Sequence, residues 1–331
     1  MSEMRWNPTM REWVVTATHR QDRTFKPPKD FCPLCGTKKD AFPTEVPADD
    51  YQMVVFENKF PAFRHEPEQE GVEGSELYPV APSKGICEVI LYTPKHEGTL
   101  TDYPTSHIRK VVELWTDRTI ELGALDYIDY VFIFENKGEV VGVTLHHPHG
   151  QLYAFPFIPP RIQREMESQR AHREKTGRCL YCDIAAEEKK AGKRVILENE
   201  SFLAAVPFYA RYPYEVHIFA KEHRQGLPEL SDGEKDDLAV ILKGVLLKYD
   251  NLFGTSFPYM MVLHQAPTTA DPPDFHFHIE FYPPMRTKDR LKYLAGCESG
   301  AGTFVNDSNP EEKAAELRNC APRSAGEISW R

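Results

Sequence analysis

The chain lacks the features that mark membrane-spanning and secreted proteins. Its first residues, MSEMRWNPTM, contain no apolar signal region, and no run of 18 apolar residues occurs in the sequence. Basic residues are fewer than acidic ones. The chain has 40 Lys and Arg against 50 Asp and Glu, which gives a net charge of -10. An acidic chain disfavours a general nucleic-acid or membrane binder, so a cytoplasmic protein acting on small molecules is the expectation.

Cysteine is sparse, and its count is odd. Of the seven cysteines, four form two CxxC pairs, Cys32 with Cys35 and Cys179 with Cys182, and three stand alone. An odd number of cysteines in a chain without a signal region argues against a disulfide framework. The two pairs therefore indicate metal binding or redox chemistry.

What the sequence does contain is an internal repeat. A CxxC pair, a strand-like segment, a Lys-His segment and an HxH motif follow one another in the same order in both halves. His96 and His223 are 127 residues apart, and the first histidines of the two HxH motifs are 129 residues apart. A repeat of this length predicts a duplicated domain rather than a solenoid. We therefore expect one domain over 1–158 and a second over 159–331.

Each half combines strand-like segments with one long helical pattern. Apolar residues recur at helical spacing over 108–120 and 238–249, and Ser231 with Glu234 fits a capping box before the second helix. A strand is expected over 140–144. The strands lie mostly before and after each helix rather than alternating with it. This order favours the α+β class, with a mostly antiparallel sheet in each half and helices packed on it.

Each CxxC pair is followed in the same half by a histidine in a Lys-His or Lys-Glu-His context and later by the first histidine of an HxH motif. Two thiolates and two imidazoles form a closed tetrahedral shell, which is the preferred set for structural zinc. The sequence therefore predicts one zinc ion per domain, bound by Cys32, Cys35, His96 and His147 in the first and by Cys179, Cys182, His223 and His276 in the second. A buried or redox-active thiol pair remains the alternative at each position.

The second site also has rival ligands. Glu165, His264 and His278 could form a harder metal site together with His276. An oxygen ligand in such a site would admit iron as well as zinc.

The segment HPHGQ at 147–151 carries the candidate chemistry. A neutral imidazole is a competent nucleophile toward phosphorus when its tautomer and direction are fixed. Only the first half keeps Gly-Gln behind its HxH motif, so His149 is the candidate nucleophile and His278 its counterpart without that role. We expect Gly150 to let a phosphate approach the backbone and Gln151 to donate hydrogen bonds to a phosphoryl oxygen. The alternative, a core or surface histidine, is disfavoured by the completeness of the motif.

HPHGQ, the upstream CxxC pair and TPKH at 93–96 resemble galactose-1-phosphate uridylyltransferase, a branch of the histidine-triad (HIT) superfamily. The resemblance extends from Arg11 to Glu298 and includes ENKG (135–138), SFPYMMVLHQAP (256–267) and HIEFYPP (278–284). It implies two tandem HIT-like domains and ping-pong catalysis. The histidine matching His149 takes UMP from UDP-glucose and releases glucose-1-phosphate. It then passes UMP to galactose-1-phosphate, which gives UDP-galactose.

The resemblance also assigns residues to substrate binding. Arg20 and Arg23 look like a two-arginine segment that reaches the nucleotide phosphates from a partner subunit, so a homodimer is expected. Gln151 is implied to steady the uridylyl-histidine intermediate. Asn58 and Asn136 match nucleotide contacts, and Gly142 and Thr144 line the approach to HPH, which Gly150 follows. Lys292, Tyr293 and Glu298 resemble the segment that closes over the sugar phosphate.

The chain departs from the common family pattern at two positions that bear on sugar specificity. Cys297 stands where many members have tyrosine, and Lys59 where many have aspartate. The second CxxC pair is similar to that of the related plant adenylyltransferase acting on ADP-glucose. The alternatives are therefore an enzyme using ADP-glucose or another nucleotide sugar, a non-catalytic zinc-stabilised nucleotide-binding module, and a CxxC redox protein.

Overall fold

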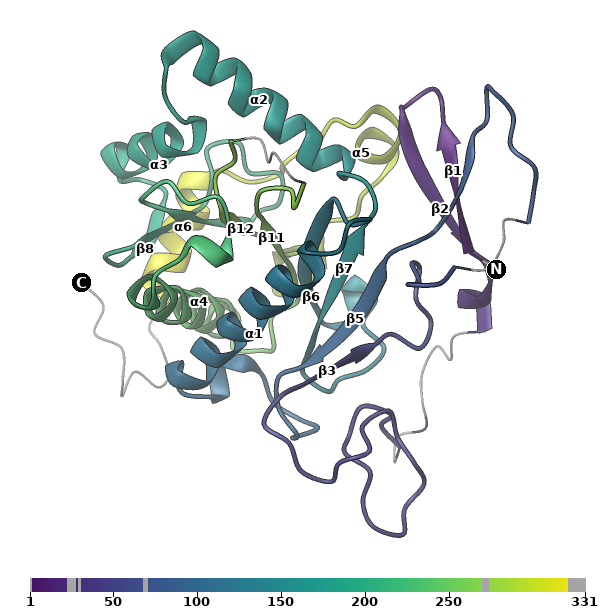
Figure 1. Cartoon of the computed structure of the whole chain (residues 1–331). Helices are drawn as coiled ribbons and strands as arrows, with labels where there is room; N and C mark the ends of the chain where they lie inside the picture. Colours follow the sequence, from purple (N-terminus) through teal and green to yellow (C-terminus); the bar gives the residue numbers. More distant parts are fainter. Residues whose placement is uncertain (1, 23–27, 29–30, 68–70, 270–273, 321–331) are drawn as a thin grey trace.

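A nine-stranded antiparallel sheet runs through the centre of the molecule (Figure 1). The computed structural model describes residues 2–22, 28, 31–67, 71–269 and 274–320. The first half contributes β3 (Val54–Glu57), β5 (Ile86–Leu91), β6 (Tyr130–Lys137) and β7 (His149–Phe155). The second half contributes β8 (Val195–Glu198), β9 (Phe202–Ala205), β10 (Val216–Ala220), β11 (Tyr259–His264) and β12 (His278–Tyr282).

The strand order shows the internal repeat in space. It runs β3-β5-β7-β6-β11-β12-β10-β9-β8, so the two halves meet at β6 and β11, where Lys137 pairs with Tyr259. Outward from this junction, each half places its HxH strand second and its Lys-His strand after it. The predicted α+β class with antiparallel sheets is confirmed. The two half-sheets are joined edge to edge, because pairing β6 with β11 satisfies backbone groups that two open edges would expose.

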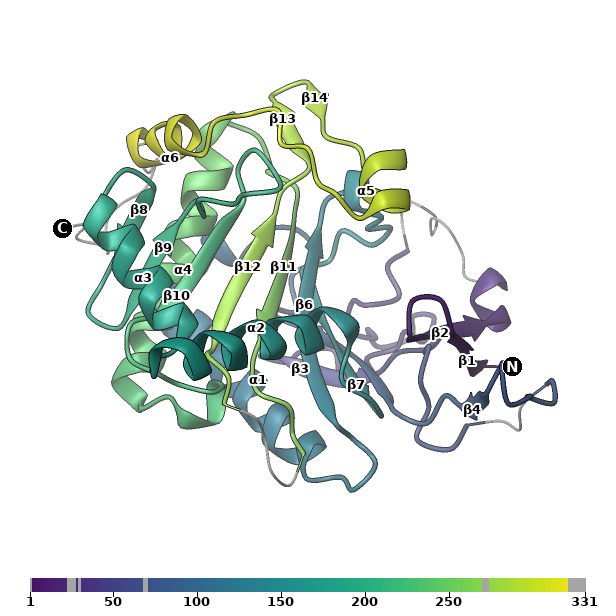
Figure 2. The same cartoon turned by 90° about the horizontal axis from the view of Figure 1, so that it is seen from above.

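Helices cover both faces of the sheet (Figure 2). The main core lies on the face that carries α1 (Thr105–Gly123), α4 (Asp232–Leu252) and α6 (Pro310–Asn319), and all three helices contribute to it. The opposite face carries α2 (Pro160–Thr176) and α3 (Leu180–Ala191), whose apolar side chains pack in separate smaller clusters.

The two predicted helices form where their apolar spacing places them. In α1, Ile108, Val111 and Trp115 are buried in the core, as one stripe of an amphipathic helix requires. Ile120, which belongs to the same sequence pattern, lies outside that stripe and is 56% exposed. In α4 the buried stripe includes Leu238 and continues to the end of the helix.

The start of α4 is fixed by the predicted capping box. The Ser231 hydroxyl accepts a hydrogen bond from the Glu234 amide, and the Glu234 carboxylate accepts one from the Ser231 amide at 2.8 Å. We expect Ser231→Ala to lower the free energy of unfolding by about 1 kcal/mol, because the first turn loses an acceptor for its unpaired amides. Chemical denaturation measures this change. An unchanged midpoint with an unchanged slope would show that the cap does not stabilise the helix.

The expected strand over 140–144 is wrong. The chain instead forms a short 3-10 helix, η3 (Glu139–Val141), followed by an irregular segment, and the next strand begins at His149. Gly138 and Gly142 flank η3 with φ of 101° and 86°, conformations that end an extended strand. HPHGQ therefore begins a strand rather than ending one.

Smaller elements surround the main sheet. A three-stranded sheet, β2-β1-β4, stands at the side of the first half. Short 3-10 helices lie between the larger elements, and the last described part of the chain adds a hairpin and a short helix. Their bounds are β1 (Ser2–Asn7), β2 (Glu12–Ala17), β4 (Val80–Pro82), β13 (Met285–Thr287), β14 (Arg290–Leu291), α5 (Gly296–Ala301), η1 (Thr18–Asp22), η2 (Leu100–Asp102) and η4 (Leu227–Glu229).

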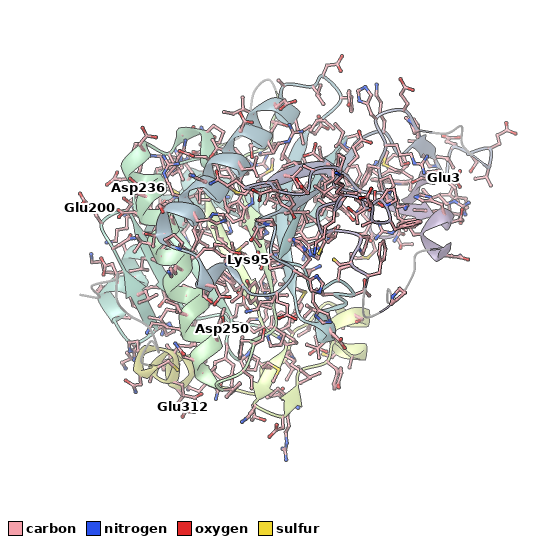
Figure 3. All side chains as sticks on the ribbon, turned by 90° about the horizontal axis from the view of Figure 1, so that it is seen from below. Glu3, Lys95, Glu200, Asp236, Asp250 and Glu312 are labelled. Atoms are coloured by element: carbon pink, nitrogen blue, oxygen red, sulfur yellow. The ribbon has the colours of Figure 1, made fainter. Side chains whose placement is uncertain are left out.

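Some of the acidic residues lie on the outside of the molecule, while others, such as Glu215 and Glu280, are buried. Glu200, Asp236 and Glu312 are exposed and project from its rim (Figure 3). Among the described residues, no helix is both long and apolar enough to span a lipid bilayer.

Candidate active site and metal centres

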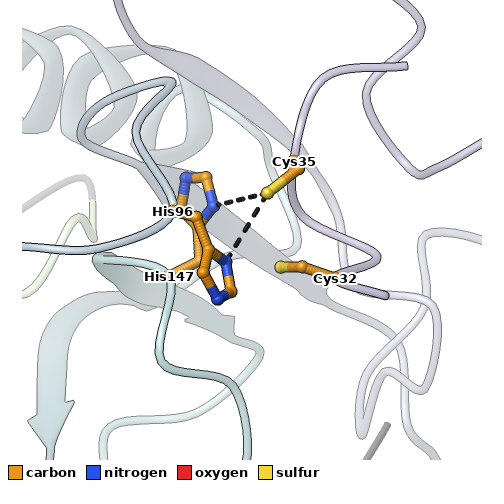
Figure 4. A group of neighbouring side chains, drawn as sticks. All are labelled: Cys32, Cys35, His96 and His147. Carbon is orange, nitrogen blue, oxygen red and sulfur yellow. Dashed lines mark hydrogen bonds between the residues drawn. The ribbon is translucent and has the colours of Figure 1, made fainter. Parts of the chain in front are cut away.

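The first predicted group of cysteines and histidines is assembled beside the start of β7 (Figure 4). Potential ligand atoms of Cys32, Cys35, His96 and His147 all lie within 4.8 Å of one another. The Sγ atom of Cys35 is 3.5 Å from Nδ1 of His96 and 3.6 Å from Nδ1 of His147. Burial and the neighbouring Cys32 raise the pKa of the Cys35 thiol to about 11, so two thiolates can coexist here only beside a cation.

The second half repeats this arrangement. Cys179, Cys182, His223 and His276 also bring one ligand atom each within 4.8 Å of the others. Nδ1 of His276 lies 3.4 Å from the sulfur of Cys179 and 3.6 Å from that of Cys182. The duplicated sequence pattern therefore corresponds to a duplicated group of side chains in space.

The imidazoles in both groups are oriented as metal ligands are. Nε2 of His147 lies 2.8 Å from the Thr93 carbonyl, and Nε2 of His276 lies 3.0 Å from the Ala220 carbonyl. When Nε2–H donates to the carbonyl, Nδ1 presents its lone pair to the cysteines. Nδ1 of His223 is buried without a hydrogen-bond partner among the described residues, while its Nε2 lies 2.8 Å from Asp274. Both sets of donors therefore fit a tetrahedral cation such as zinc.

The rival ligands of the second half form a separate group. Glu165, His264 and His278 lie together, and their fourth neighbour is Glu280 rather than His276. Nδ1 of His264 is 3.0 Å from Glu165, and Nε2 of His278 is 3.6 Å from Glu280. The residues thought to compete for one site therefore belong to two adjacent groups.

His149 begins β7 with its ring held by the backbone of the same motif. Its Nδ1 lies 2.7 Å from the carbonyl oxygen of His147, so Nδ1–H donates and the lone pair is on Nε2. The side chain of His147 joins the Cys/His group, and its carbonyl orients His149. Burial lowers the pKa of His147, which keeps this ring neutral. His147 thus links the first Cys/His group to the candidate nucleophile, His149.

Two cavities meet at His149. One has a volume of about 280 Å³ and is lined by His149, Gln151, Asn58, Thr144 and apolar walls that include Phe56. The other has a volume of about 340 Å³. Its lining includes His149, Asn136, Lys137, Tyr92 and Glu135. An imidazole at this junction can reach a group that extends from one cavity into the other.

The strand explains why His149 and Gln151 act on the same side. Side chains alternate along β7, and the odd-numbered residues are half-buried while Gly150, Leu152 and Ala154 are fully buried. His149 pairs with Leu91 and Gln151 with Val89, on the face away from α1. Gln151 therefore faces the same cavity as His149 and can donate to a group bound there.

The other predicted substrate residues are placed unevenly. Arg20 donates to the carbonyl of Phe60, a residue that lines the smaller cavity, at 3.2 Å, and Arg23 lies outside the described residues. Gly142 ends η3 and is not in the lining of either cavity.

The segment carrying Lys292, Tyr293 and Glu298 is likewise absent from the lining of both cavities. Lys292 is 3.0 Å from Glu298, and Tyr293 is 75% exposed. Within one chain, this segment is not brought to His149.

The HxH motif of the second half shows the same backbone geometry at a buried position. Nδ1 of His278 lies 2.8 Å from the His276 carbonyl, as in the first half. However, His278 is fully buried and stacked against Tyr181, with ring centroids 4.2 Å apart. Glu280 stands where the first half has Gln151. His149 thus lines two cavities whereas His278 is buried, and the restriction of the chemistry to the first motif stays a prediction.

Sequence reasoning missed several residues around His149. The smaller cavity has aromatic walls, Phe31, Phe56 and Phe60, suited to a planar ring. Phe56 and Phe60 flank Asn58, which the resemblance assigns to nucleotide binding, so their spacing was a usable signal. Glu135 opens the ENKG segment of the resemblance, but the sequence does not place Glu135 or Tyr92 near HPHGQ, because only strand pairing brings them there.

Comparison with known proteins identifies the group to which this site belongs. The N-terminal domain of galactose-1-phosphate uridyl transferase matches residues 1–159, and the C-terminal domain of the same family matches residues 165–324. The chain belongs to the galactose-1-phosphate uridylyltransferase family. A galactose-1-phosphate uridylyltransferase of Thermotoga maritima is 43% identical, over 96% of this chain and 98% of that protein. One from Rattus norvegicus is 35% identical over 95% and 86% of the two chains.

Solved structures of the uridylyltransferase family have the same fold. A structure described as uridylyltransferase superposes with a TM-score of 0.85 at 34% identity, over 96% of this chain and 98% of that one. An ADP-glucose phosphorylase from Arabidopsis thaliana with bound ADP-glucose gives a TM-score of 0.72 at 25% identity, over 97% and 99% of the chains. The uridylyltransferase is thus the more similar of these two.

Proposed function

We propose that this protein transfers UMP from UDP-glucose to galactose-1-phosphate, giving UDP-galactose and glucose-1-phosphate. The family supports this reaction, and the curated relatives carry the name of that activity. The observation that carries the proposal is the placement of His149, whose Nδ1 is held by the His147 carbonyl at the junction of two cavities. A ring fixed in this way can attack from Nε2.

The proposed reaction proceeds in two displacements at the α-phosphorus. Nε2 of His149 forms a bond to phosphorus as the bond to the glucose-1-phosphate oxygen breaks, which leaves a uridylyl-histidine. The phosphate of galactose-1-phosphate then attacks the same phosphorus, and the bond to Nε2 breaks. Gln151 donates to a phosphoryl oxygen in both steps, because it lines the same cavity as His149.

Gln151 also protects the intermediate in this scheme. An amide cannot supply a proton to a leaving group, whereas an imidazole at the same position could assist attack by water. We expect Gln151→His to raise release of free UMP from UDP-glucose, without acceptor, by about tenfold or more. Gln151→Asn is the control that keeps an amide. A rate of UMP release in Gln151→His no higher than in wild type would contradict this role.

Turnover with two substrate pairs tests the function directly. We expect UDP-glucose with galactose-1-phosphate to be converted at least about a hundredfold faster, by kcat/KM, than ADP-glucose with phosphate. A faster second reaction would overturn the proposal.

The second candidate is a phosphorylase that acts on ADP-glucose or another nucleotide sugar. The structural likeness to the Arabidopsis ADP-glucose phosphorylase favours it. Both candidates use His149 in the same way and differ in the base and acceptor that the cavities accept. Competition between UDP-glucose and ADP-glucose for labelling of His149 distinguishes them.

We further propose that zinc occupies both Cys/His groups, one ion in each half. Each group offers two thiolates and two imidazoles within 4.8 Å, a closed shell suited to a structural ion. The adjacent group of Glu165, His264 and His278 offers an oxygen ligand, which would admit iron. Elemental analysis of purified protein distinguishes these occupants.

The domain boundary and the assembly are proposals as well. We place the boundary between residues 158 and 159, directly before α2 begins at Pro160. We also propose a homodimer, in which Arg20 and Arg23, and the segment of Lys292, Tyr293 and Glu298, approach the active site of the partner. For the segment of Lys292, Tyr293 and Glu298, its absence from the lining of both cavities within one chain supports that arrangement. Sedimentation equilibrium measures the assembly state.

A further inference from the structure

Tyr92, Gly150 and Glu135 lie in a row behind His149. Gly150 is the second residue of β7, Glu135 belongs to the adjacent β6, and Tyr92 follows β5 on the other side. The Tyr92 amide donates to the Pro148 carbonyl at 3.3 Å, so the pairing of β5 and β7 extends to this point. All three side-chain positions face the layer of α1, opposite to the side chain of Gln151.

The Tyr92 hydroxyl fills the space that a side chain at residue 150 would need. A Cβ atom on Gly150 would overlap the hydroxyl oxygen of Tyr92 and lie 2.9 Å from its Cζ. It would also lie 3.4 Å from the carbonyl oxygen of Phe134. Gly150 is not among the glycines with positive φ, so its backbone conformation does not require glycine. What requires glycine is the tyrosine lying over the strand.

This geometry changes the expected reason for Gly150. From the sequence, the glycine was expected to let a phosphate approach the backbone. In the structure the missing side chain points toward the core, where Tyr92 packs near Trp115, and away from the cavity that Gln151 lines. The close approach at this position is made by Tyr92.

Glu135 completes the row as a buried carboxyl group. Tyr259 donates to its Oε1 at 2.6 Å, and Lys137 lies over the Tyr259 ring while pairing with Asp250 at 2.8 Å. Oε2 of Glu135 and the hydroxyl of Tyr92 are buried without a hydrogen-bond partner among the described residues. The Glu135 carboxyl contributes to raising the pKa of Tyr92, and the Tyr92 hydroxyl acts to lower the pKa of Glu135. Burial raises the pKa of Glu135, which favours the neutral carboxylic acid.

Tyr92, Gly150 and Glu135 bear on catalysis because they lie beside the backbone that positions His149. The segment from His147 to Gly150 supplies the carbonyl that fixes the His149 ring, and it begins the strand that carries Gln151. Tyr92 contacts this segment twice, through its amide at Pro148 and its hydroxyl at Gly150. Tyr92 and Glu135 also line the larger of the two cavities that meet at His149. A shift of the phenol would therefore move the nucleophile.

We propose that Tyr92 and Glu135 are positioning residues for His149, with the Tyr92 hydroxyl seated over Gly150 and the Glu135 carboxyl on the same face of the sheet, in the lining of the same cavity. This inference rests on the proposed function in that His149 is the nucleophile. Neither residue touches the reacting atoms. Their effect is on the rate at which His149 is modified and not on how tightly the substrate binds.

A double-mutant cycle between residues 92 and 150 tests the contact. Gly150→Ala should lower the melting temperature and slow single-turnover labelling of the protein by UDP-glucose by about a hundredfold. Tyr92→Phe alone should slow labelling by about tenfold with KM within twofold of wild type. In the Tyr92→Phe background, Gly150→Ala should regain at least tenfold in labelling rate and part of its melting temperature, because the overlapping oxygen is gone. Equal effects of Gly150→Ala in both backgrounds would overturn the proposal.

Variants at Glu135 test its positioning role. Glu135→Gln keeps an uncharged donor and acceptor and should label within threefold of wild type, whereas Glu135→Leu should slow labelling at least tenfold with KM unchanged. Tyr249→Phe is the matched control, because its buried hydroxyl donates to the Tyr214 carbonyl in the other half, and its labelling rate should equal that of wild type. Wild-type labelling rates in Tyr92→Phe and Glu135→Leu would refute positioning. No labelling of wild type would refute the proposed function instead, while the melting temperatures would still test the contact.

Discussion

His149→Ala should lower kcat by about 10⁴-fold or more while the protein stays folded. Removing a covalent nucleophile eliminates both displacement steps, and what remains is binding and polarisation of the phosphate. His149 is at the surface of two cavities rather than in the core, so its loss should change the melting temperature little. Steady-state turnover with UDP-glucose and galactose-1-phosphate measures the effect.

The matched control is His172→Ala. His172 lies on α2 in the other half, where its Nε2 is 2.7 Å from Asp183, and it should keep normal turnover. Binding of UDP-glucose to His149→Ala separates the remaining alternatives. If the variant binds UDP-glucose and still turns over within tenfold of wild type, the nucleophile is another residue. If wild type itself binds but never turns over, the protein is a binding module.

His96→Ala and His223→Ala each remove one histidine from one Cys/His group. Each variant should lose one metal ion per chain and be less stable than wild type. A structural zinc site contributes its binding free energy to folding, on the order of several kcal/mol, so we expect a decrease in melting temperature of roughly 10 °C. We expect the consequences for activity to differ. His96→Ala disturbs the group that contains His147, whose carbonyl holds His149, and turnover should fall by about a hundredfold.

His223→Ala serves as the comparison for His96→Ala. Its group contains His276, and His278 of the second HxH motif is fully buried. The folded fraction of this variant should therefore keep turnover within about threefold of wild type. Elemental analysis, thermal unfolding and turnover of both variants measure these effects. Wild-type protein that holds no metal and whose activity depends on oxidation of its thiols would contradict this scheme and support the redox alternative.

The two Cys/His groups could be predicted because a short-range sequence pattern identifies their cysteines. CxxC places two thiols together whatever the fold, and the repeat supplied the matching histidines at similar offsets, 127 and 129 residues. Two long helices were also predictable, since their apolar spacing is a local property. The assignment of His276 to the cysteines, with Glu165 left in a separate group, depends on tertiary packing and was left open by the sequence.

The residues around Gly150 could not be predicted for a different reason. Tyr92, Glu135 and Gly150 are separated by long stretches of sequence and meet only through the register of three strands. The HPHG motif reads the same whether the glycine makes room for a phosphate or for a tyrosine, so the sequence cannot distinguish the two. The strand expected over 140–144 was misjudged because valines outweighed the two glycines that turn the chain.

The most direct test of the central claim is to incubate the protein with UDP-glucose labelled in its α-phosphate and to map the modified residue. We predict one UMP group per chain, stable to base and labile to acid, on His149. Addition of galactose-1-phosphate should release it quantitatively as UDP-galactose. Label on any other residue, or label that persists in His149→Ala, would contradict the assignment of His149 as the nucleophile.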